Sequence, residues 1–412
     1  MKILIKPRRL SGTVTPPPSK SMAHRTLISA ALAGGKSLIS NLHFSDDVNA
    51  TLKCLQCIGA SWKPAGDGAV EVIGTAGRGA DGAQLFNCGE SGSTLRFFIP
   101  IALALYGRGR FTGMGRLMKR PQGPYLDLFM ERGISFSYSK DSLEVSGELT
   151  HGGYSLRGDV SSQFFSGLLF ALPLLAGDST LDAATRLESL PYVEMTRGAQ
   201  AKAGIEIGGG GGSYTVRGRQ SYSPFSAAVE ADWSQAAFWN MANLLGCGIK
   251  LEGMDGASMQ GDRVHGLAIA ETLSGGEKEA AIDLSDCPDL LPPAAAAAAL
   301  RGAGTSVRFY NAARLRMKES DRLAVVASVI NALGGRAAEE RDGITIYGCG
   351  SLRGGVEISC CGDHRIAMMA AIAAVRCEND VVLDGAECVR KSYPSFWEDY
   401  KSLGGCVEEI EP

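Results

Sequence analysis

One pattern of hydrophobic and polar positions returns six times along the chain. Each copy opens with a short polar cluster, continues with about 10–14 residues rich in Ala and Leu at helical spacing, and passes through a glycine-containing break into a short β-branched run. The copies begin at positions 20, 91, 161, 232, 289 and 363, at intervals of 71, 70, 71, 57 and 74 residues. The pattern predicts a repeated helix-and-strand unit, and the short fourth interval indicates trimmed loops.

A second, more amphipathic helix is expected between successive copies of this pattern. Over residues 321–333, Leu323, Val326 and Ile330 fall on one helical face, and a pair of glycines then leads to a strand over 344–347. Each unit is therefore predicted to consist of a strand, a helix, a strand, a helix and two strands, which is an α/β architecture.

The count of units predicts two domains. Three units occupy residues 19–228 and three more occupy 229–412, with the boundary expected in the aperiodic stretch 222–229. A strand over residues 2–6 is left over from this count. Glycine makes up 53 of the 412 residues, nearly twice the usual ~7%. We expect these glycines to end twelve helices in the left-handed conformation.

The starts of the six Ala/Leu-rich helices carry polar residues. An α-helix presents unpaired N–H groups and a partial positive charge at its N-terminus. Six such starts would form a natural receptor for a small molecule with several negative charges. Phosphate and carboxylate ligands are therefore the leading hypothesis from the pattern alone.

Composition and charge narrow the class of protein. Hydrophobic residues make up 45% and charged residues 21%, as in folded globular proteins. The 41 Lys and Arg against 44 Asp and Glu give a net charge of −3, which excludes the broad positive field of a nucleic-acid-binding protein. The 11 scattered cysteines are typical of reduced thiols in the cytoplasm. We expect no signal peptide and no membrane span.

Zinc sites have cysteine and histidine ligands at characteristic spacings. Cys360 and Cys361 lie near His364, but no second pair has the spacing of a zinc site, so we expect no metal.

Polar clusters with candidate chemistry lie at the predicted helix starts. Ser21 and Arg25 are one helical turn apart, which suits an anion, although a helix cap with solvated cations explains them equally well. Gly92 lies among hydroxyl residues and allows a ligand to approach the backbone, with Arg96 one turn further on. Further basic or charged clusters are the loop 115–121 and the residues Asp363, His364, Arg365, Arg390 and Lys391.

The densest cluster of charge lies in the segment 314–322. Arg314, Arg316 and Lys318 alternate, so we expect them on one face of a strand, and Glu319 follows just before a helix. A surface charge pattern is the ordinary alternative. A carboxylate among cations has a lowered pKa and can carry a proton or anchor a salt bridge.

Six strings in this order resemble the 5-enolpyruvylshikimate-3-phosphate synthases over essentially the whole chain. They are 18–25 (PSKSMAHR), 88–96 (CGESGSTLR), 119–121 (KRP), 161–163 (SSQ), 316–322 (RMKESDR) and 363–368 (DHRIAM). The resemblance implies a two-domain inside-out α/β barrel, the enolpyruvyl transferase fold, with three βαβαββ repeats around buried parallel helices in each domain. It also assigns residues 1–18 to the C-terminal domain. Glu90 and Arg314 depart from the family pattern, which often has Asn at both positions.

The resemblance also implies an activity. Members of this family transfer the enolpyruvyl group of phosphoenolpyruvate to the 5-hydroxyl of shikimate 3-phosphate and release phosphate, a step of the shikimate pathway toward chorismate and the aromatic amino acids. The resemblance implies a cytoplasmic monomer with no cofactor, with these two small molecules as its partners and with its active site in the cleft between the domains. It implies neither nucleic acid nor membrane as a partner.

Residue roles follow from the same resemblance. Shikimate 3-phosphate would be held by Lys20, Ser21, Arg25, Ser161, Ser162, Gln163, Ser189, Tyr192, Asp289 and Lys318. Phosphoenolpyruvate would be held by Lys20, Gly92, Arg120, Gln163, Arg322, Arg365 and Lys391. Asp289 would accept the 5-hydroxyl proton, and Glu319 and Lys20 would move protons at the methylene carbon. The chemistry needs such groups, because an alcohol loses a proton while an enol carbon gains one.

Two alternatives remain to be weighed. Enolpyruvyl transfer to UDP-N-acetylglucosamine shares the fold, but that group has a Lys-Asn pair where this chain has Lys20 and Ser21, and it usually has a Cys in the loop that is Gly113 to Pro121 here. A non-catalytic anion-binding module would have lost its acid and base residues, and Lys20, Asp289 and Glu319 are all present.

Overall fold

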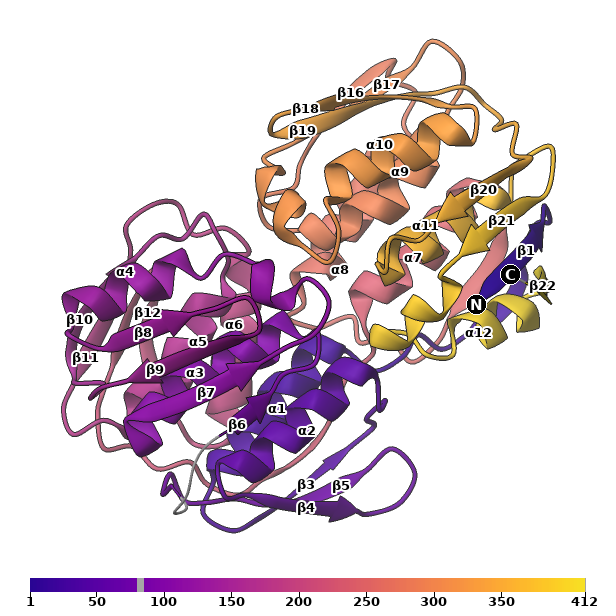
Figure 1. Cartoon of the computed structure of the whole chain (residues 1–412). Helices are drawn as coiled ribbons and strands as arrows, with labels where there is room; N and C mark the ends of the chain where they lie inside the picture. Colours follow the sequence, from indigo (N-terminus) through magenta and orange to yellow (C-terminus); the bar gives the residue numbers. More distant parts are fainter. Residues whose placement is uncertain (80–84, 412) are drawn as a thin grey trace. The chain divides into compact units, whose positions relative to one another are not determined.

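The computed structural model describes residues 1–79 and 85–411, which form two compact units (Figure 1). Unit 1 comprises Met1–Pro17 and Ala231–Pro412, and unit 2 comprises Pro18–Glu230. The chain therefore crosses from one unit to the other twice. Each unit has its own hydrophobic core.

Unit 2 is built from six helices and twelve strands within its described residues. The helices are α1 (Lys20–Leu32), α2 (Asp46–Cys57), α3 (Gly92–Tyr106), α4 (Gly123–Glu131), α5 (Gln163–Ala171) and α6 (Leu190–Lys202). The strands are β3 (Lys36–Ser40), β4 (Ser61–Pro64), β5 (Val70–Ile73), β6 (Leu85–Asn87), β7 (Arg108–Thr112), β8 (Ser135–Tyr138), β9 (Ser142–Ser146), β10 (Gly152–Leu156), β11 (Ser179–Ala183), β12 (Ile207–Gly210), β13 (Ser213–Val216) and β14 (Ser226–Ala228).

The strands of unit 2 form three four-stranded sheets of one design. Their orders are β14-β3-β5-β4, β6-β7-β9-β8 and β10-β11-β13-β12. In each sheet the first two strands are parallel and the last two form an antiparallel hairpin. Phe86 of β6 lies opposite Phe111 of β7, and their rings stack at 4.8 Å. This is the βαβαββ repeat that the sequence predicts.

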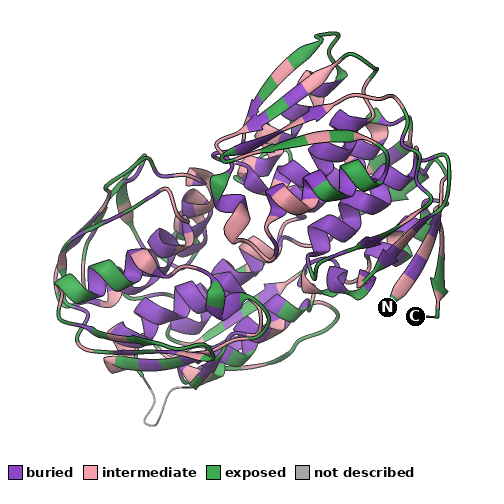
Figure 2. Cartoon of the chain, turned by 45° about the horizontal axis from the view of Figure 1, so that its top comes forward, coloured by how far each residue is buried: buried purple, intermediate pink, exposed green. Residues whose placement is uncertain are grey.

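The Ala- and Leu-rich helices lie inside and the sheets lie outside. In α1, every residue from Met22 to Leu32 is buried, whereas strands such as β7 alternate between buried and exposed positions. Figure 2 shows the same contrast between helices and strands. A helix that is buried on every side needs mostly apolar side chains, which explains why Ala and Leu are frequent in these segments.

Unit 1 has the same architecture in its described residues. Its helices are α7 (Trp233–Leu244), α8 (Gly261–Ser274), α9 (Leu291–Ala299), α10 (Arg322–Ala332), α11 (His364–Ala374) and α12 (Phe396–Ser402). Its strands are β1 (Lys2–Lys6), β2 (Ser11–Val14), β15 (Gly248–Leu251), β16 (Glu279–Asp283), β17 (Ser306–Tyr310), β18 (Arg336–Glu340), β19 (Gly343–Tyr347), β20 (Val356–Ser359), β21 (Val381–Asp384) and β22 (Cys406–Ile410).

The N-terminal segment completes two sheets of unit 1. β1 lies between β21 and β22 in the order β20-β21-β1-β22, so the strand that the repeat count left over is an interior strand. β2 pairs with β15. In unit 2, β14 comes last along the chain but pairs with β3, so it is the first strand in the order of the sheet β14-β3-β5-β4.

The fourth repeat is shorter than the others. Its sheet has two strands, β15 and β2, whereas the remaining sheet of unit 1 has the order β16-β17-β19-β18. Within residues 231–278, α8 is not followed by a hairpin. The 57-residue interval therefore reflects the loss of a strand pair, and the expectation of trimmed loops is corrected.

The glycines cap fewer helices than expected. Gly107 ends α3 in the left-handed conformation with φ 65°, and six other helices among the described residues are followed by a glycine of positive φ, namely Gly59, Gly133, Gly204, Gly246, Gly334 and Gly404. The core helices α1, α9 and α11 are followed by the C-cap residues Ala33, Leu300 and Val375, all at negative φ. Ala33 and Val375 are buried and Leu300 is partly buried. No helix of the described chain is long and apolar enough to cross a membrane.

Candidate active site

In unit 2, the starts of α1 and α3 carry serine caps. Ser19 Oγ accepts a hydrogen bond from Met22 N at 3.4 Å, and Ser91 Oγ accepts one from Thr94 N at 3.2 Å. Lys20 is the first residue of α1, and its Nζ lies 2.8 Å from Asp47 Oδ2. The predicted cation therefore has a carboxylate partner that the sequence analysis missed.

Arg25 is fixed by neighbours from two helices. Its Nη1 donates to Ser21 O at 2.7 Å, its Nη2 donates to Tyr192 O at 2.9 Å, and its Nε donates to Thr196 Oγ1 at 2.8 Å. Burial lowers the pKa of Arg25 to about 10, and the side chain is 1% exposed. Ser189 stands at the N-terminal end of the helix of Tyr192, in the left-handed conformation with φ 57°. Four predicted residues of the shikimate 3-phosphate set thus lie at one place.

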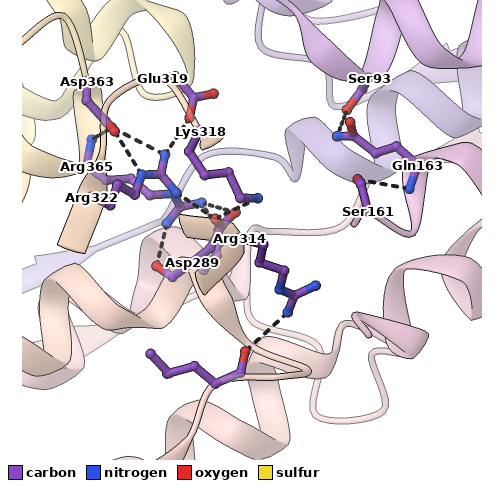
Figure 3. Close-up of polar contacts among 12 residues, drawn as sticks. Ser93, Ser161, Gln163, Asp289, Arg314, Lys318, Glu319, Arg322, Asp363 and Arg365 are labelled. Atoms are coloured by element: carbon purple, nitrogen blue, oxygen red, sulfur yellow. Dashed lines mark hydrogen bonds and ion pairs between the residues drawn. The ribbon is translucent and has the colours of Figure 1, made fainter. Parts of the chain in front are cut away.

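The starts of α3 and α5 are tied together by side chains. Gln163 Nε2 donates to Ser93 Oγ at 2.9 Å, and Gln163 N donates to Ser161 Oγ at 3.3 Å (Figure 3). Arg96 Nη1 donates to Gln163 Oε1 at 2.8 Å. Ser162 precedes α5 without capping it, so its hydroxyl is not used by the helix.

Gly92 lies under a guanidinium group. A Cβ atom at this position would stand 2.7 Å from Arg120 Nη1 and 3.5 Å from Gln163 Oε1. The absence of a side chain therefore lets Arg120 approach the first N–H groups of α3. A guanidinium above a helix start is suited to an oxyanion.

In unit 1, the carboxylate of Asp289 contacts three cationic side chains (Figure 3). Asp289 lies in a short 3-10 turn (Pro288–Leu290) before α9. Its Oδ1 accepts from Arg322 Nη1 at 2.8 Å and lies 3.7 Å from Lys318 Nζ, and its Oδ2 accepts from Arg365 Nη2 at 3.1 Å. The sequence separation of these residues shows that only the fold brings them together.

Arg322 also binds two further carboxylates. Its Nε donates to Asp363 Oδ2 at 2.8 Å and its Nη2 donates to Glu319 Oε2 at 2.8 Å. Asp363 also caps α11 through Arg365 N at 3.0 Å. The predicted proton carrier Glu319 therefore shares one guanidinium group with Asp289.

Charge and burial set the protonation of this cluster. Burial opposes the charge of Asp289, but Arg365, Lys318 and Arg322 outweigh it and hold the pKa of this carboxyl well below its usual range. Burial lowers the pKa of Lys318 to about 8, although Asp289 acts in the opposite direction. Burial opposes the charge of Arg322, but Asp363, Glu319 and Asp289 together outweigh it and raise the pKa of this guanidinium. The cluster therefore contains ionised carboxylates and one lysine that titrates near neutral pH.

The segment before α10 is a 3-10 helix, η4 (Ala313–Met317), and not the strand that the alternating charges predicted. Arg316 turns away and pairs with Asp321 at 3.0 Å and Glu339 at 2.6 Å. Arg314 is buried and donates through Nη2 to Leu284 O at 3.2 Å and to Ser285 O. The three cations thus do not share a face, because a chain that coils every three residues disperses alternate side chains.

Lys391 lies at the end of a 3-10 helix, η5 (Ala386–Lys391), and its Nζ donates to Gly362 O at 2.7 Å. This contact holds it beside the loop that leads to Asp363. In the described part of the chain, no three His, Cys, Asp or Glu side chains gather as a metal site would require.

Unit 2 has helix starts rich in hydroxyl groups and cations, and unit 1 has ionised carboxylates held by cations. Each unit by itself is therefore suited to binding anionic ligands. Solved structures share this fold. An EPSP synthase from Acinetobacter baumannii aligns with a TM-score of 0.81 over 100% of both chains at 23% identity. An enolpyruvyl transferase from Streptomyces tendae aligns with a TM-score of 0.77 over 99% of this chain and 98% of its own at 17% identity. The fold is that of the enolpyruvyl transferases, as the resemblance implied.

Sequence comparison identifies the family. The profile of the EPSP synthase (3-phosphoshikimate 1-carboxyvinyltransferase) family matches residues 4–400. A 3-phosphoshikimate 1-carboxyvinyltransferase from Clostridium kluyveri is 42% identical over 99% of this chain and 98% of its own length. The chain belongs to the EPSP synthase family, and the resemblance found in its six strings is confirmed.

Proposed function

We propose that this chain catalyses the reaction for which its family is named, the transfer of the enolpyruvyl group of phosphoenolpyruvate to the 5-hydroxyl of shikimate 3-phosphate with release of phosphate. The observation that carries the proposal is the partly buried Asp289 carboxylate, held between Arg322, Arg365 and Lys318. Such a group is an unprotonated acceptor surrounded by binding groups for anions.

The residues proposed to bind the two substrates differ in their chemistry. The proposed shikimate 3-phosphate ligands of unit 2 are hydroxyl groups and one buried arginine, namely Ser21, Ser161, Ser162, Ser189, Tyr192 and Arg25, with Lys20 and Gln163 beside them. Asp289 and Lys318 of unit 1 would bind the ring hydroxyls. For phosphoenolpyruvate the proposed ligands are Lys20, Gly92, Arg120, Gln163, Arg322, Arg365 and Lys391. Guanidinium groups match carboxylate and phosphate oxygens in pairs.

Substrate binding would activate the base. In the ligand-free protein the cations hold the pKa of Asp289 low, and a carboxylate of low pKa is a weak base. Phosphoenolpyruvate would occupy Arg322 and Arg365 with its own negative charges, which weakens their hold on Asp289 and raises its pKa. Asp289 would then accept the proton of the 5-hydroxyl.

The second proton moves at the methylene carbon. Glu319 lies on Arg322, the same guanidinium group that Asp289 contacts. We assign Glu319 and Lys20 to the protonation and deprotonation of this carbon. An addition followed by an elimination needs one group to give a proton and another to take it back.

Membership of this family also suggests how the domains act, the oligomeric state and the location of the protein. We propose that residues 19–228 and residues 1–18 with 229–412 act as two domains whose residues serve one pair of substrates in the cleft between the domains. The chain would act as a cytoplasmic monomer, without a cofactor, and without nucleic acid or a membrane as partner.

Phosphate release measures the reaction directly. Wild-type protein should release phosphate from phosphoenolpyruvate only when shikimate 3-phosphate is present, and release with UDP-N-acetylglucosamine instead would contradict the proposal. Glu319→Gln should lower kcat by roughly 10²–10⁴-fold and leave shikimate 3-phosphate binding measurable by fluorescence. Glu339→Gln is the matched control, because Glu339 pairs with Arg316 outside the cluster, and it should keep wild-type activity.

A further inference from the structure

A line of buried hydrogen bonds runs through unit 2 from His24 of α1 to the start of α3. His24 Nδ1 lies 2.7 Å from Thr51 Oγ1 of α2. Thr51 Oγ1 lies 2.7 Å from Thr94 Oγ1, which lies 2.7 Å from Ser91 Oγ. None of the four residues is more than 1% exposed. We call His24, Thr51, Thr94 and Ser91 the His24 relay.

The number of protons fixes the direction of the relay. The Thr94 hydroxyl donates to Ser91 Oγ, so the Thr94 oxygen accepts from Thr51, since each hydroxyl has one proton. The Thr51 oxygen must then accept from His24 Nδ1–H. The reverse direction would place the proton on His24 Nε2, which has no hydrogen-bond partner among the described residues. A buried N–H without an acceptor is rare and costly.

His24 starts the relay as a neutral group. Burial lowers the pKa of His24 well below its ordinary value, and the nearby charges of Lys20 and Arg25 lower it further. The imidazole therefore carries one proton, on Nδ1, and holds the direction of the relay.

The relay ends on a hydroxyl whose own proton is unused. Ser91 Oγ accepts twice, from Thr94 N and from Thr94 Oγ1, and in residues 1–79 and 85–411 no acceptor is found for its proton. Ser91 directly precedes Gly92, above which lies the Arg120 guanidinium. A buried donor without an acceptor, placed beside a cation and a helix start, is suited to an anion that arrives from outside.

We infer that Ser91 is a further binding residue for phosphoenolpyruvate, and that the His24 relay directs the Ser91 hydroxyl proton to an oxygen of this substrate. The inference rests on the proposed function, which places phosphoenolpyruvate at Gly92 and Arg120. His24, Thr51 and Thr94 are positioning residues that act through Ser91. Hydrogen bonds in a chain polarise one another, and the last bond, to a charged oxygen, gains most.

Steady-state kinetics of single variants test the inference. Ser91→Ala removes the donor, and Thr51→Val breaks the relay away from the ligand with little change of shape. Each should raise the KM for phosphoenolpyruvate about 10-fold, the effect of losing one hydrogen bond to a charged group, while shikimate 3-phosphate affinity stays at the wild-type level. Thr51→Ser is the matched control, because it restores the hydroxyl and should restore the KM. A wild-type KM in folded Ser91→Ala, or equal KM values in Thr51→Ser and Thr51→Val, would overturn the inference.

Ser91→Ala also removes the cap of α3 and can therefore destabilise the protein. A measurement on the wild-type protein avoids this complication. The ¹⁵N NMR shifts of His24 should show the Nδ1–H tautomer, unchanged from about pH 5 to pH 8, the range in which an ordinary histidine titrates. An Nε2–H tautomer, or titration within this range, would contradict the relay. Failure of the proposed function looks different, since wild-type protein would then release no phosphate with shikimate 3-phosphate.

Discussion

Lys318 loses its proton more easily than a lysine in water. Burial lowers its pKa to about 8, against an ordinary value of 10.5. If the charged form binds shikimate 3-phosphate, kcat/KM for this substrate should fall about tenfold per pH unit above pH 8, because the charged fraction falls at that rate. In Lys318→Arg, which stays charged, the break near pH 8 should disappear. A constant kcat/KM of the wild-type protein from pH 8 to 9.5 would show that the charge is not needed.

As pH rises, titration of Lys318 should raise the free energy of unfolding, whereas it should lower kcat/KM. Between pH 8 and 10.5 the unfolded chain holds a proton on Lys318 that the folded chain has released. The contribution of Lys318 to the free energy of unfolding therefore rises with pH across this window. Binding and stability should thus separate, which distinguishes titration of Lys318 from general alkaline unfolding.

At the scale of residues, the sequence predicts cations better than their partners. Lys20, Arg322 and Arg365 stand in recognisable strings, and each lies at a helix start as expected. Asp47 was missed as the partner of Lys20. Its signal, an acidic residue in the first turn of a capped helix, locates a helix start but says nothing about which cation the fold brings there.

At the scale of elements, an asparagine near the C-terminal end of each of two helices binds the backbone N–H and C=O of one residue in the following strand. Asn243 Oδ1 accepts from Ile249 N and its Nδ2 donates to Ile249 O, both at 2.8 Å. Asn331 binds Ala337 of β18 in the same way. In β15, whose repeat lacks the hairpin, the Asn243 amide thus binds both backbone groups of Ile249.

Loss of the Asn243 amide should therefore destabilise the fourth repeat. Asn243→Ala leaves the N–H and C=O of buried Ile249 without partners, and we expect about 1–3 kcal/mol less free energy of unfolding, measured by urea denaturation. Asn331→Ala is the matched variant at an exposed site and should cost less, because water can take over its hydrogen bonds. Equal losses in the two variants would show that the amide does not protect a buried edge.

Periodicity predicted the elements that repeat, but it predicted neither the irregular segment 313–317 nor the strand pair that the fourth repeat lacks. The six core helices and their strands follow from Ala/Leu runs and β-branched segments. The chain over 313–317 alternates in charge like a strand yet forms η4, because the side chains there satisfy tertiary partners such as Asp321 and Ser285 rather than a sheet. The missing hairpin was visible only as a short interval.

At the scale of the whole molecule, the two units differ in how they depend on the chain termini. Unit 2 is one continuous segment, whereas unit 1 needs β1 and β2 from residues 1–17. Deletion of residues 1–17 should leave unit 1 unfolded, because β1 is an interior strand. Residues 18–230 alone should fold and bind shikimate 3-phosphate weakly. Limited proteolysis and circular dichroism measure the first result, and calorimetry measures the second.

A rearranged chain provides the control. Lys2 lies opposite Ile410 in the antiparallel pair of β1 and β22, so a short turn can join the two chain ends. Residues 231–412 followed directly by residues 1–17 should therefore fold as unit 1. If this rearranged chain and the deleted chain are equally sensitive to protease, the N-terminal strands are not what unit 1 lacks.

The interior position of β1 also sets the order in which the protein can fold during its synthesis. β1 leaves the ribosome before its neighbours β21 and β22, which follow close to 400 residues later. At roughly 5–20 residues per second this strand waits about 20–80 s for its partners, while the continuous unit is completed. The apolar Ile3, Leu4 and Ile5 stay unpaired during this time, flanked by Lys2, Lys6, Arg8 and Arg9. We expect these four charges to disfavour pairing of the nascent strand with another chain.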